Sequence, residues 1–276
     1  MKSENEINEA FYTEYTDSKY VRRYVGDTAG EGIAHILDRV YGPLYVEAVN
    51  TILKANITSN GFRILEYGCG GGMNLIWILR YLEAKGIDVD LGVGADFSPS
   101  MIEAAETEAA AHLSPAMAEK SRFLVAANES IQPDLDKAMT GEVGTFHLIL
   151  GVNTFRYALR LKKAESTAQQ LYDLLAPGGV SIMIDMNGRF PFFKSRLPNR
   201  LTMSEEQRYL PNLKEYAAPF REAGFTFDTE KCFCWVPHSA GKATVAVSSG
   251  LSPVLQTLFG GFAMRCLIVG RKPLDA

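Results

Sequence analysis

Short apolar runs alternate with stretches of helical periodicity over most of the chain after residue 61. The runs predict buried strands, and the intervening stretches predict helices. This alternation is typical of an α/β domain in which a mainly parallel sheet carries helices on both faces. Right-handed crossovers would place the strands in one doubly wound sheet. The seven predicted strands are 63–67, 91–95, 123–125, 146–150, 180–184, 225–236 and 262–270.

Capping and breaking residues mark several of the predicted helices. The helix after the second strand is expected to begin at Ser98, whose hydroxyl can cap it, with Pro99 in the first helical position. The helix before the fifth strand is ended by Pro177-Gly178-Gly179. A further helix is predicted over about 212–223, and it leads into the sixth strand.

Residues 1–60 and two later segments are predicted to decorate the core, which spans 61–276. Segment 188–212 is rich in Arg, Pro and Phe without clean periodicity, and segment 237–261 is a long connection with a short helix at about 254–259. Both segments are interpreted as insertions on the substrate side of the sheet.

The first 60 residues are predicted to form an N-terminal helical cap. Residues 8–28 are too aromatic for a disordered tail, but they have no strong apolar stripe. Ligands of open α/β sheets bind at the carboxyl ends of the strands, so this segment is expected to close over them as a lid. Packing on the outer helices or on a partner subunit is the alternative. The tyrosines concerned are Tyr12, Tyr15, Tyr20 and Tyr24.

Composition and charge narrow the class of partner. The chain has 276 residues, of which 47% are hydrophobic and 22% charged, as in an ordinary globular domain. A net charge of −4 provides no basic footprint for nucleic-acid backbones, so a small molecule or a protein is the expected substrate. The polar, acidic N-terminus does not resemble a signal peptide, and no apolar run approaches membrane-spanning length. The protein is therefore predicted to be cytoplasmic, with no membrane partner.

A glycine-rich turn joins the first strand to the helix that follows it. Such a turn lets the backbone approach a ligand closely and aims free helix amides into the crevice, so it predicts a nucleotide-like cofactor. Gly68, Gly70 and Gly72 follow the spacing G-x-G-x-G. A dinucleotide fingerprint would place its third glycine at position 73, which is Met73, so pyrophosphate binding is disfavoured.

Three ordered motifs follow one another along the chain. Ile64–Gly72, with the sequence ILEYGCGGG, resembles the first motif of class I S-adenosylmethionine-dependent methyltransferases, a family that places an acid two positions before the glycines. Val93–Met101 resembles the second-strand motif, and Leu174–Gly179 resembles the turn into the fifth strand. Together the motifs cover roughly residues 62–186 and are more specific than a lone glycine loop. The resemblance implies S-adenosyl-L-methionine as cofactor.

The resemblance also implies roles for the matching residues. Asp96 would accept hydrogen bonds from both ribose hydroxyls, and Phe97 would pack on the adenine. A helix-capping acid and an ordinary core aromatic are the respective alternatives. The Glu66 carboxylate would favour the ammonium group of the cofactor, or it would simply be satisfied by nearby amides. The residues expected around the methionine part are Glu66, Gly68, Cys69, Gly70 and Gly72.

The third strand departs from the family pattern. Where the family often has an Asp for the adenine amino group, this chain has Ala127, and Asn128 and Glu129 are the available substitutes. A surface turn is the alternative for Asn128. The glycine and asparagine after the fourth strand would line the methionine end. The further cofactor contacts expected at the strand ends are therefore Asn128, Glu129, Gly151 and Asn153. Tyr20 of the predicted lid is expected to contact the cofactor as well.

Methyl transfer is an in-line displacement at an activated sulfonium carbon, so the protein mainly supplies alignment and exclusion of water. A base matters only when the acceptor must lose a proton. Arg156 could clamp an acceptor carboxylate or pair on the surface. His238 is the histidine best placed, in the long connection beside the predicted pocket. The candidates for catalysis or acceptor contact are Tyr15, Arg156, Tyr157 and His238.

A metal site is not expected. It would need an acid after the fourth strand to join Asp185 and Asn187, and the chain offers only the sequence Gly151-Val152-Asn153 there. The four cysteines suit neither a disulfide framework nor a zinc site, and they are interpreted as small apolar core residues.

The sequence thus predicts methyl transfer to an oxygen or nitrogen of a small-molecule metabolite. An NAD(P)-dependent oxidoreductase is one alternative, and a non-catalytic subunit that binds the cofactor for an interaction or regulatory role is another. A homodimer is compatible with the sequence.

Overall fold

The computed structural model describes residues 36–140, 143–191, 210–236 and 240–275. In this part of the chain, seven strands form one sheet in the order β3-β2-β1-β4-β5-β7-β6. β1 to β5 pair in parallel, and β7 runs antiparallel to β5 and β6. The mainly parallel, doubly wound sheet predicted from the sequence is confirmed. The strands are β1 (Phe62–Tyr67), β2 (Val89–Asp96), β3 (Ser121–Val125), β4 (Phe146–Val152), β5 (Leu175–Met186), β6 (Thr226–Phe233) and β7 (Arg265–Arg271).

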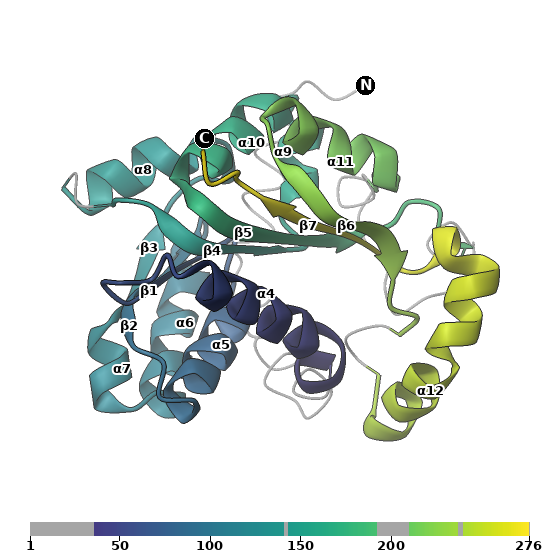
Figure 1. The fold of residues 1–276 in the computed structure, drawn as a ribbon, viewed down its shortest axis with the longest axis horizontal. Helices are drawn as coiled ribbons and strands as arrows, with labels where there is room; N and C mark the ends of the chain where they lie inside the picture. Colours follow the sequence, from purple (N-terminus) through teal and green to yellow (C-terminus); the bar gives the residue numbers. More distant parts are fainter. Residues whose placement is uncertain (1–35, 141–142, 192–209, 237–239, 276) are drawn as a thin grey trace.

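Helices cover both faces of the sheet (Figure 1). Each layer buries its own hydrophobic cluster, one centred on α4 to α6 and the other on α8 to α11. The layer below the sheet in Figure 1 holds the π-helical turn η1 (Leu37–Tyr41), α4 (Gly42–Ala55), α5 (Met73–Ala84), α6 (Pro99–His112) and α7 (Pro115–Glu119). The layer above holds α8 (Ile131–Ala138), α9 (Phe155–Arg160), α10 (Ala164–Leu174) and α11 (Leu213–Glu222).

The predicted caps explain where two of these helices begin. The Ser98 Oγ accepts from the Met101 amide at 3.4 Å, and Pro99 occupies the first position of α6. Asn212 caps α11 in a reciprocal arrangement with Glu215, in which each side chain accepts from the backbone amide of the other residue. The capping residues therefore set where α6 and α11 begin.

α4 is part of the domain core rather than an outlying element. Its buried residues Tyr45, Ala48, Val49 and Ile52 belong to the same cluster as the apolar face of α5. The lid expected from residues 8–28 lies outside the described residues, as do 192–209 in the first predicted insertion.

The second predicted insertion differs from expectation. In place of a short helix at 254–259, the structure has α12 (Lys242–Phe259), an 18-residue helix that leads into the 3₁₀ turn η5 (Gly260–Phe262). Gly250 and Pro253 lower helix propensity, but a proline removes only one backbone hydrogen bond and the helix continues through it. In Figure 1, α12 stands at one end of the sheet, beyond the end of β6.

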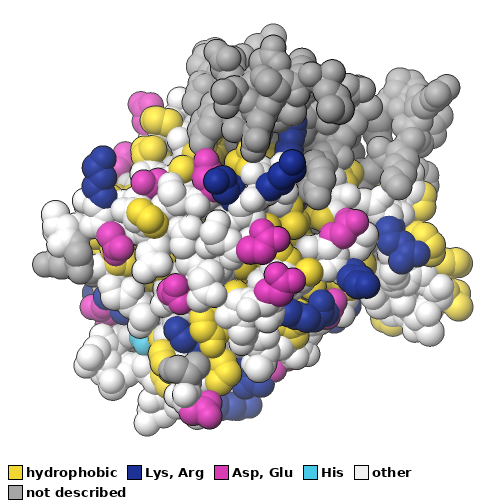
Figure 2. All heavy atoms as spheres, turned by 90° about the horizontal axis from the view of Figure 1, so that it is seen from above, with side chains coloured by type: hydrophobic (Ala, Val, Ile, Leu, Met, Phe, Trp, Pro, Cys, Tyr) yellow, Lys and Arg dark blue, Asp and Glu magenta, His cyan; other side chains and the backbone are white. Residues whose placement is uncertain are grey.

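The composition of α12 bears on the expectation that no apolar run approaches membrane-spanning length. Lys242–Phe262 spans 21 residues and contains an 18-residue window with a mean hydropathy of 1.2, so it is long and apolar enough to cross a membrane by length and composition alone. Ser and Thr residues interrupt the apolar positions in sequence, so no continuous apolar run is visible there. Hydrophobic side chains gather at the right edge of Figure 2, the end of the molecule where α12 lies. Elsewhere on that face, described acidic and basic side chains are interspersed.

Candidate cofactor-binding site

The turn after β1 needs glycine for conformation and for space. Gly68, Gly70 and Gly72 have φ values of 66°, 50° and 76°, in the left-handed region that glycine adopts without strain. A Cβ on Gly68 would lie 2.1 Å from the Thr154 Oγ1. A Cβ on Gly72 would lie 2.9 Å from the Phe123 ring. The turn is thereby fixed against β3 and against the segment that follows β4.

Asp96, at the end of β2, is tied to this turn. One carboxylate oxygen accepts from the Gly70 amide at 2.9 Å, and the other accepts from the Ser98 amide at 2.9 Å. A carboxylate has about four lone-pair positions, so each oxygen retains acceptor capacity. Burial raises the pKa of Asp96, and the backbone hydrogen bonds oppose that shift.

Glu66 lies one residue before the end of β1 and is buried. Its carboxylate accepts from the Asn74 side-chain amide at 2.6 Å and from the Leu75 backbone amide at 2.9 Å. The Tyr45 hydroxyl donates to the Asn74 Oδ1 at 2.9 Å, which links α4 to the site. Burial raises the pKa of Glu66 to about 8 despite the two hydrogen bonds. The nearby amides do satisfy this carboxylate, as the alternative interpretation proposed, but they leave it without a cationic partner among the described residues.

The end of β3 lies beside Asp96, because the Ala126 amide donates to the Asp96 carbonyl at 3.0 Å. Asn128 is buried at the start of the 3₁₀ turn η2 (Asn128–Ser130), so it is not on an exposed surface turn. Glu129 and Phe97 are half-buried. The residues expected around the adenosine part thus come together at the ends of β2 and β3.

The end of β4 is shaped mainly by packing. A Cβ on Gly151 would lie 2.5 Å from the Met183 sulfur, so β5 alone explains this glycine. Asn153 has a φ of 60°, and its amide donates to the Ile184 carbonyl at 2.7 Å. The Asn153 side-chain oxygen accepts from the buried Arg265 of β7. Asn153 is therefore held by β5 and β7 at the edge of the site.

Arg156 is buried and does not pair on the surface. It is 4% exposed, and its guanidinium pairs with the fully buried Asp185 at 3.2 Å. It also donates to the Tyr157 hydroxyl at 2.7 Å, and its backbone amide donates to the other Asp185 oxygen at 3.0 Å. The structure therefore gives Arg156 an internal partnership with Asp185 and Tyr157, and the surface pairing considered from the sequence is wrong.

The remaining candidates are placed as follows. Tyr15, Tyr20 and His238 lie outside the described residues. Asn187 donates to the Gly261 and Ala263 carbonyls, at 3.1 and 2.7 Å, so it ties the end of β5 to the start of β7. In the part of the chain that the structure describes, no group of three His, Cys, Asp or Glu side chains is arranged to bind a metal ion. The four cysteines are buried and free.

Several residues that build the site gave no signal in the sequence. Asn74, Thr154 and Arg265 contact Glu66, the Gly68 position and Asn153 respectively. Their partners lie 8, 86 and 112 residues away in the chain, so only the tertiary structure brings them together. Asn74 alone follows the glycine motif closely enough to have been considered a site residue.

The chemistry of the site fits S-adenosylmethionine. Glu66 and Asp96 are buried carboxylates at adjacent strand ends, and neither forms an ion pair with a described residue. A buried carboxylate without a cation is costly, so a ligand with a positive charge and hydroxyl donors would stabilise both. The ammonium and ribose hydroxyl groups of S-adenosylmethionine supply those groups.

Comparisons with known proteins agree with this assignment. A family model described as a methyltransferase domain matches residues 65–181, which run from β1 into β5 and include the glycine turn. The chain matches no curated protein sequence.

Several solved structures share the fold. Magnesium protoporphyrin IX methyltransferase from Synechocystis PCC 6803, with bound SAM, is 11% identical, with 96% of this chain and 97% of that chain covered at a TM-score of 0.54. An O-methyltransferase family protein from Burkholderia thailandensis is 14% identical, with 97% and 63% covered at 0.53. The [4+2]-cyclase SpnF is 14% identical, with 78% and 76% covered at 0.51.

The sheet order and the glycine turn define a Rossmann-like fold. Residues 65–181 match a methyltransferase domain, and this match together with the glycine turn supports a class I methyltransferase that uses S-adenosylmethionine.

Proposed function

We propose that this methyltransferase transfers the methyl group of S-adenosylmethionine to an oxygen or nitrogen atom of a small-molecule metabolite. The observation that carries the cofactor half of the proposal is the pair of buried carboxylates without cations, Glu66 and Asp96, on either side of the glycine turn. A net charge of −4 and the interspersed charges of Figure 2 favour a small acceptor over a nucleic acid.

Bound S-adenosylmethionine supplies a methyl group that is already activated by the sulfonium charge. The tasks left to this chain are binding, orientation and exclusion of water. Asp96 would accept from the ribose hydroxyls, and Glu66 would accept from the ammonium group once ionised. The buried Arg156–Asp185 pair would hold the segment after β4 in place without touching the acceptor. No base is assigned.

Calorimetry with purified protein tests the cofactor half. S-adenosylmethionine and its demethylated product should bind with micromolar affinity, and NAD(P) should not bind. Mass spectrometry of metabolite extracts, incubated with the protein and S-adenosylmethionine, should then detect a product that has gained one methyl group. Tight cofactor binding without any such product would favour the non-catalytic alternative. The cyclase SpnF shares the fold, so the fold alone does not fix the reaction.

A further inference from the structure

We infer that the methyl acceptor has an apolar body, and that this body lies in a groove between α12 and the carboxyl ends of β5 and β6. The inference rests on the proposed function and specifies its substrate class. The groove has a volume of about 780 Å³, which is within the range of pockets that hold drug-sized ligands.

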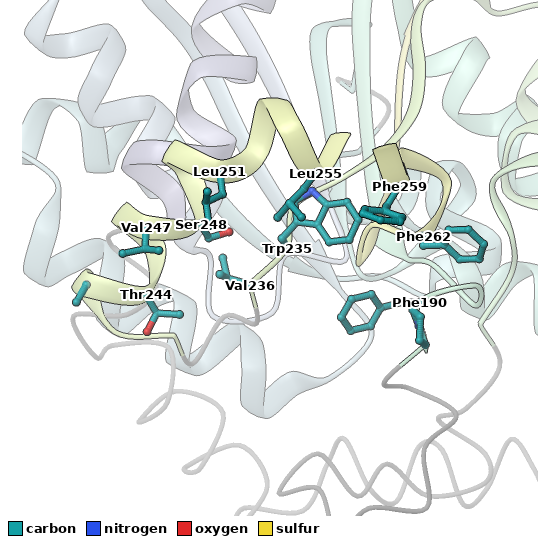
Figure 3. Close-up of a pocket in the computed structure, with 12 residues that line it drawn as sticks. Phe190, Trp235, Val236, Thr244, Val247, Ser248, Leu251, Leu255, Phe259 and Phe262 are labelled. Atoms are coloured by element: carbon teal, nitrogen blue, oxygen red, sulfur yellow. The ribbon is translucent and has the colours of Figure 1, made fainter. Parts of the chain in front are cut away.

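The groove is lined almost entirely by apolar and aromatic side chains (Figure 3). Trp235 is near the middle of the view, with Leu251 of α12 on its left and Phe259 on its right. Phe190, Phe259 and Phe262 gather at one end, and Thr244 and Val247 line the other. The Trp235 indole nitrogen is buried without a hydrogen-bond partner among the described residues.

The position of the groove connects it to the cofactor site. Phe190 follows β5 by four residues, and Trp235 follows β6 by two. The Asn187 amide donates to the Met264 carbonyl at 2.9 Å, and the Met264 amide donates to the Cys234 carbonyl at 2.8 Å, so these strand ends are joined. Ligands of open α/β sheets bind at this edge, where Asn153 and the glycine turn also lie.

The two sides of the groove differ in burial, because one is part of the core and the other is an exposed helix. Phe190 and Val236 are buried, so its floor is built on the core. α12 forms the opposite wall, and only Val245 of this helix is buried. Val247 and Leu251 are 63% and 52% exposed although they line the groove. Covering apolar side chains of this size contributes about 25 cal/mol per Å², so an apolar ligand would stabilise the helix where it stands.

An experiment can use the small number of tryptophans. The chain has two tryptophans. Trp77 lies away from the groove, where its indole nitrogen donates a hydrogen bond to Asp38 and its ring stacks on Tyr81. In a Trp77→Phe background, Trp235 is therefore the sole tryptophan donor for energy transfer to N-phenyl-1-naphthylamine, a neutral apolar dye. The full chain should show saturable transfer in this background.

Two exposed leucines of α12 provide matched variants. Leu251 lines the groove, whereas Leu258 is 65% exposed and lies outside it. Leu251→Lys should weaken dye binding by about tenfold or more, because an ammonium would enter the apolar groove, and Leu258→Lys should change it by less than about twofold. Binding of S-adenosylmethionine, measured by calorimetry, should be unchanged in both variants.

Absence of saturable transfer, or an equal loss in the two variants, would overturn the inference. An equal loss accompanied by sedimentation of the protein with phosphatidylcholine vesicles would instead assign the outer face of α12 to a membrane surface. Failure of S-adenosylmethionine to bind the parent protein would refute the proposed function separately, because the dye measurement does not depend on the cofactor.

Discussion

Replacing Glu66 by Gln should remove a pH dependence that the structure builds into the protein. In the absence of ligands, burial raises the pKa of this carboxyl from 4.5 to about 8, while the hydrogen bonds from Asn74 and Leu75 oppose the shift. The folded state therefore holds a proton that the unfolded state releases. The resulting stability is fully present below pH 4.5 and is lost as the pH rises through about 8.

The magnitude follows from linkage. Between the two pKa values, one proton difference changes the free energy of unfolding by about 1.4 kcal/mol for each pH unit. Raising the pH from 6 to 8 should therefore lower the stability of the ligand-free protein by about 2 kcal/mol through this residue. A glutamine is neutral at every pH and resembles the protonated acid, so the Glu66→Gln variant should lack this component.

Urea denaturation of the two proteins, measured without cofactor at several pH values from 6 to 8.5, checks the expectation. Other titrating groups affect both proteins alike, so the difference between the two curves isolates Glu66. Parallel curves would refute the assignment of a raised pKa to this carboxyl.

Cofactor binding gives a second measurement of the same group. An ammonium group beside Glu66 favours the ionised carboxylate, so binding should release a proton at pH 7 and should become tighter as the pH rises toward 8. Calorimetry in buffers of different ionisation enthalpy detects that proton. The Glu66→Gln variant should bind the cofactor more weakly and release fewer protons on binding. An equal release in both proteins would place the ammonium away from Glu66.

Three other changes test the site. Asp96→Ala should weaken binding of S-adenosylmethionine, measured by calorimetry, by about 2 kcal/mol or more, since the ribose hydroxyls lose a charged acceptor. The control Glu106→Ala, on the exposed side of α6, should leave the affinity unchanged. Gly68→Ala should cost at least about 2 kcal/mol more stability in urea denaturation than Gly86→Ala. Both glycines have a φ near 67°, but only at Gly68 does Thr154 occupy the position that a Cβ would need. Equal losses of stability in the two variants would therefore contradict the packing argument. Methyl transfer should survive EDTA, and loss of activity restored by magnesium would show that a metal takes part.

Most of the fold was predictable because its signals are local. The strand β1 is rich in apolar residues, and the helix α6 begins after a capping serine and with a proline, so neighbours in sequence fix both elements. The glycine turn and Asp96 were found for the same reason, since each lies within a short motif. The structure adds the 2.9 Å hydrogen bond that joins them, from the Gly70 amide to Asp96.

The contacts that could not be predicted depend on distant partners. A surface ion pair was one interpretation of Arg156, but its partner Asp185 is 29 residues further along the chain, on the next strand of the sheet, and the pair is buried. α12 looked like a loop with a short helix because Gly250 and Pro253 interrupt it. The helical spacing of Val247, Leu251 and Leu255 was the signal present in the sequence.

The two halves of the site are fixed by different parts of the molecule. The cofactor half is formed by the ends of β1 and β2 and the turn between β1 and α5. Its two carboxylates are held by the backbone amides of Gly70, Leu75 and Ser98. The groove is formed by segments after β5 and β6 together with α12, and its wall is a nearly unburied helix. Substitutions on the inner face of α12 can change what the groove accepts without disturbing either carboxylate. Acceptor preference should therefore respond to residues such as Leu251 and Leu255, while cofactor affinity responds to Glu66 and Asp96.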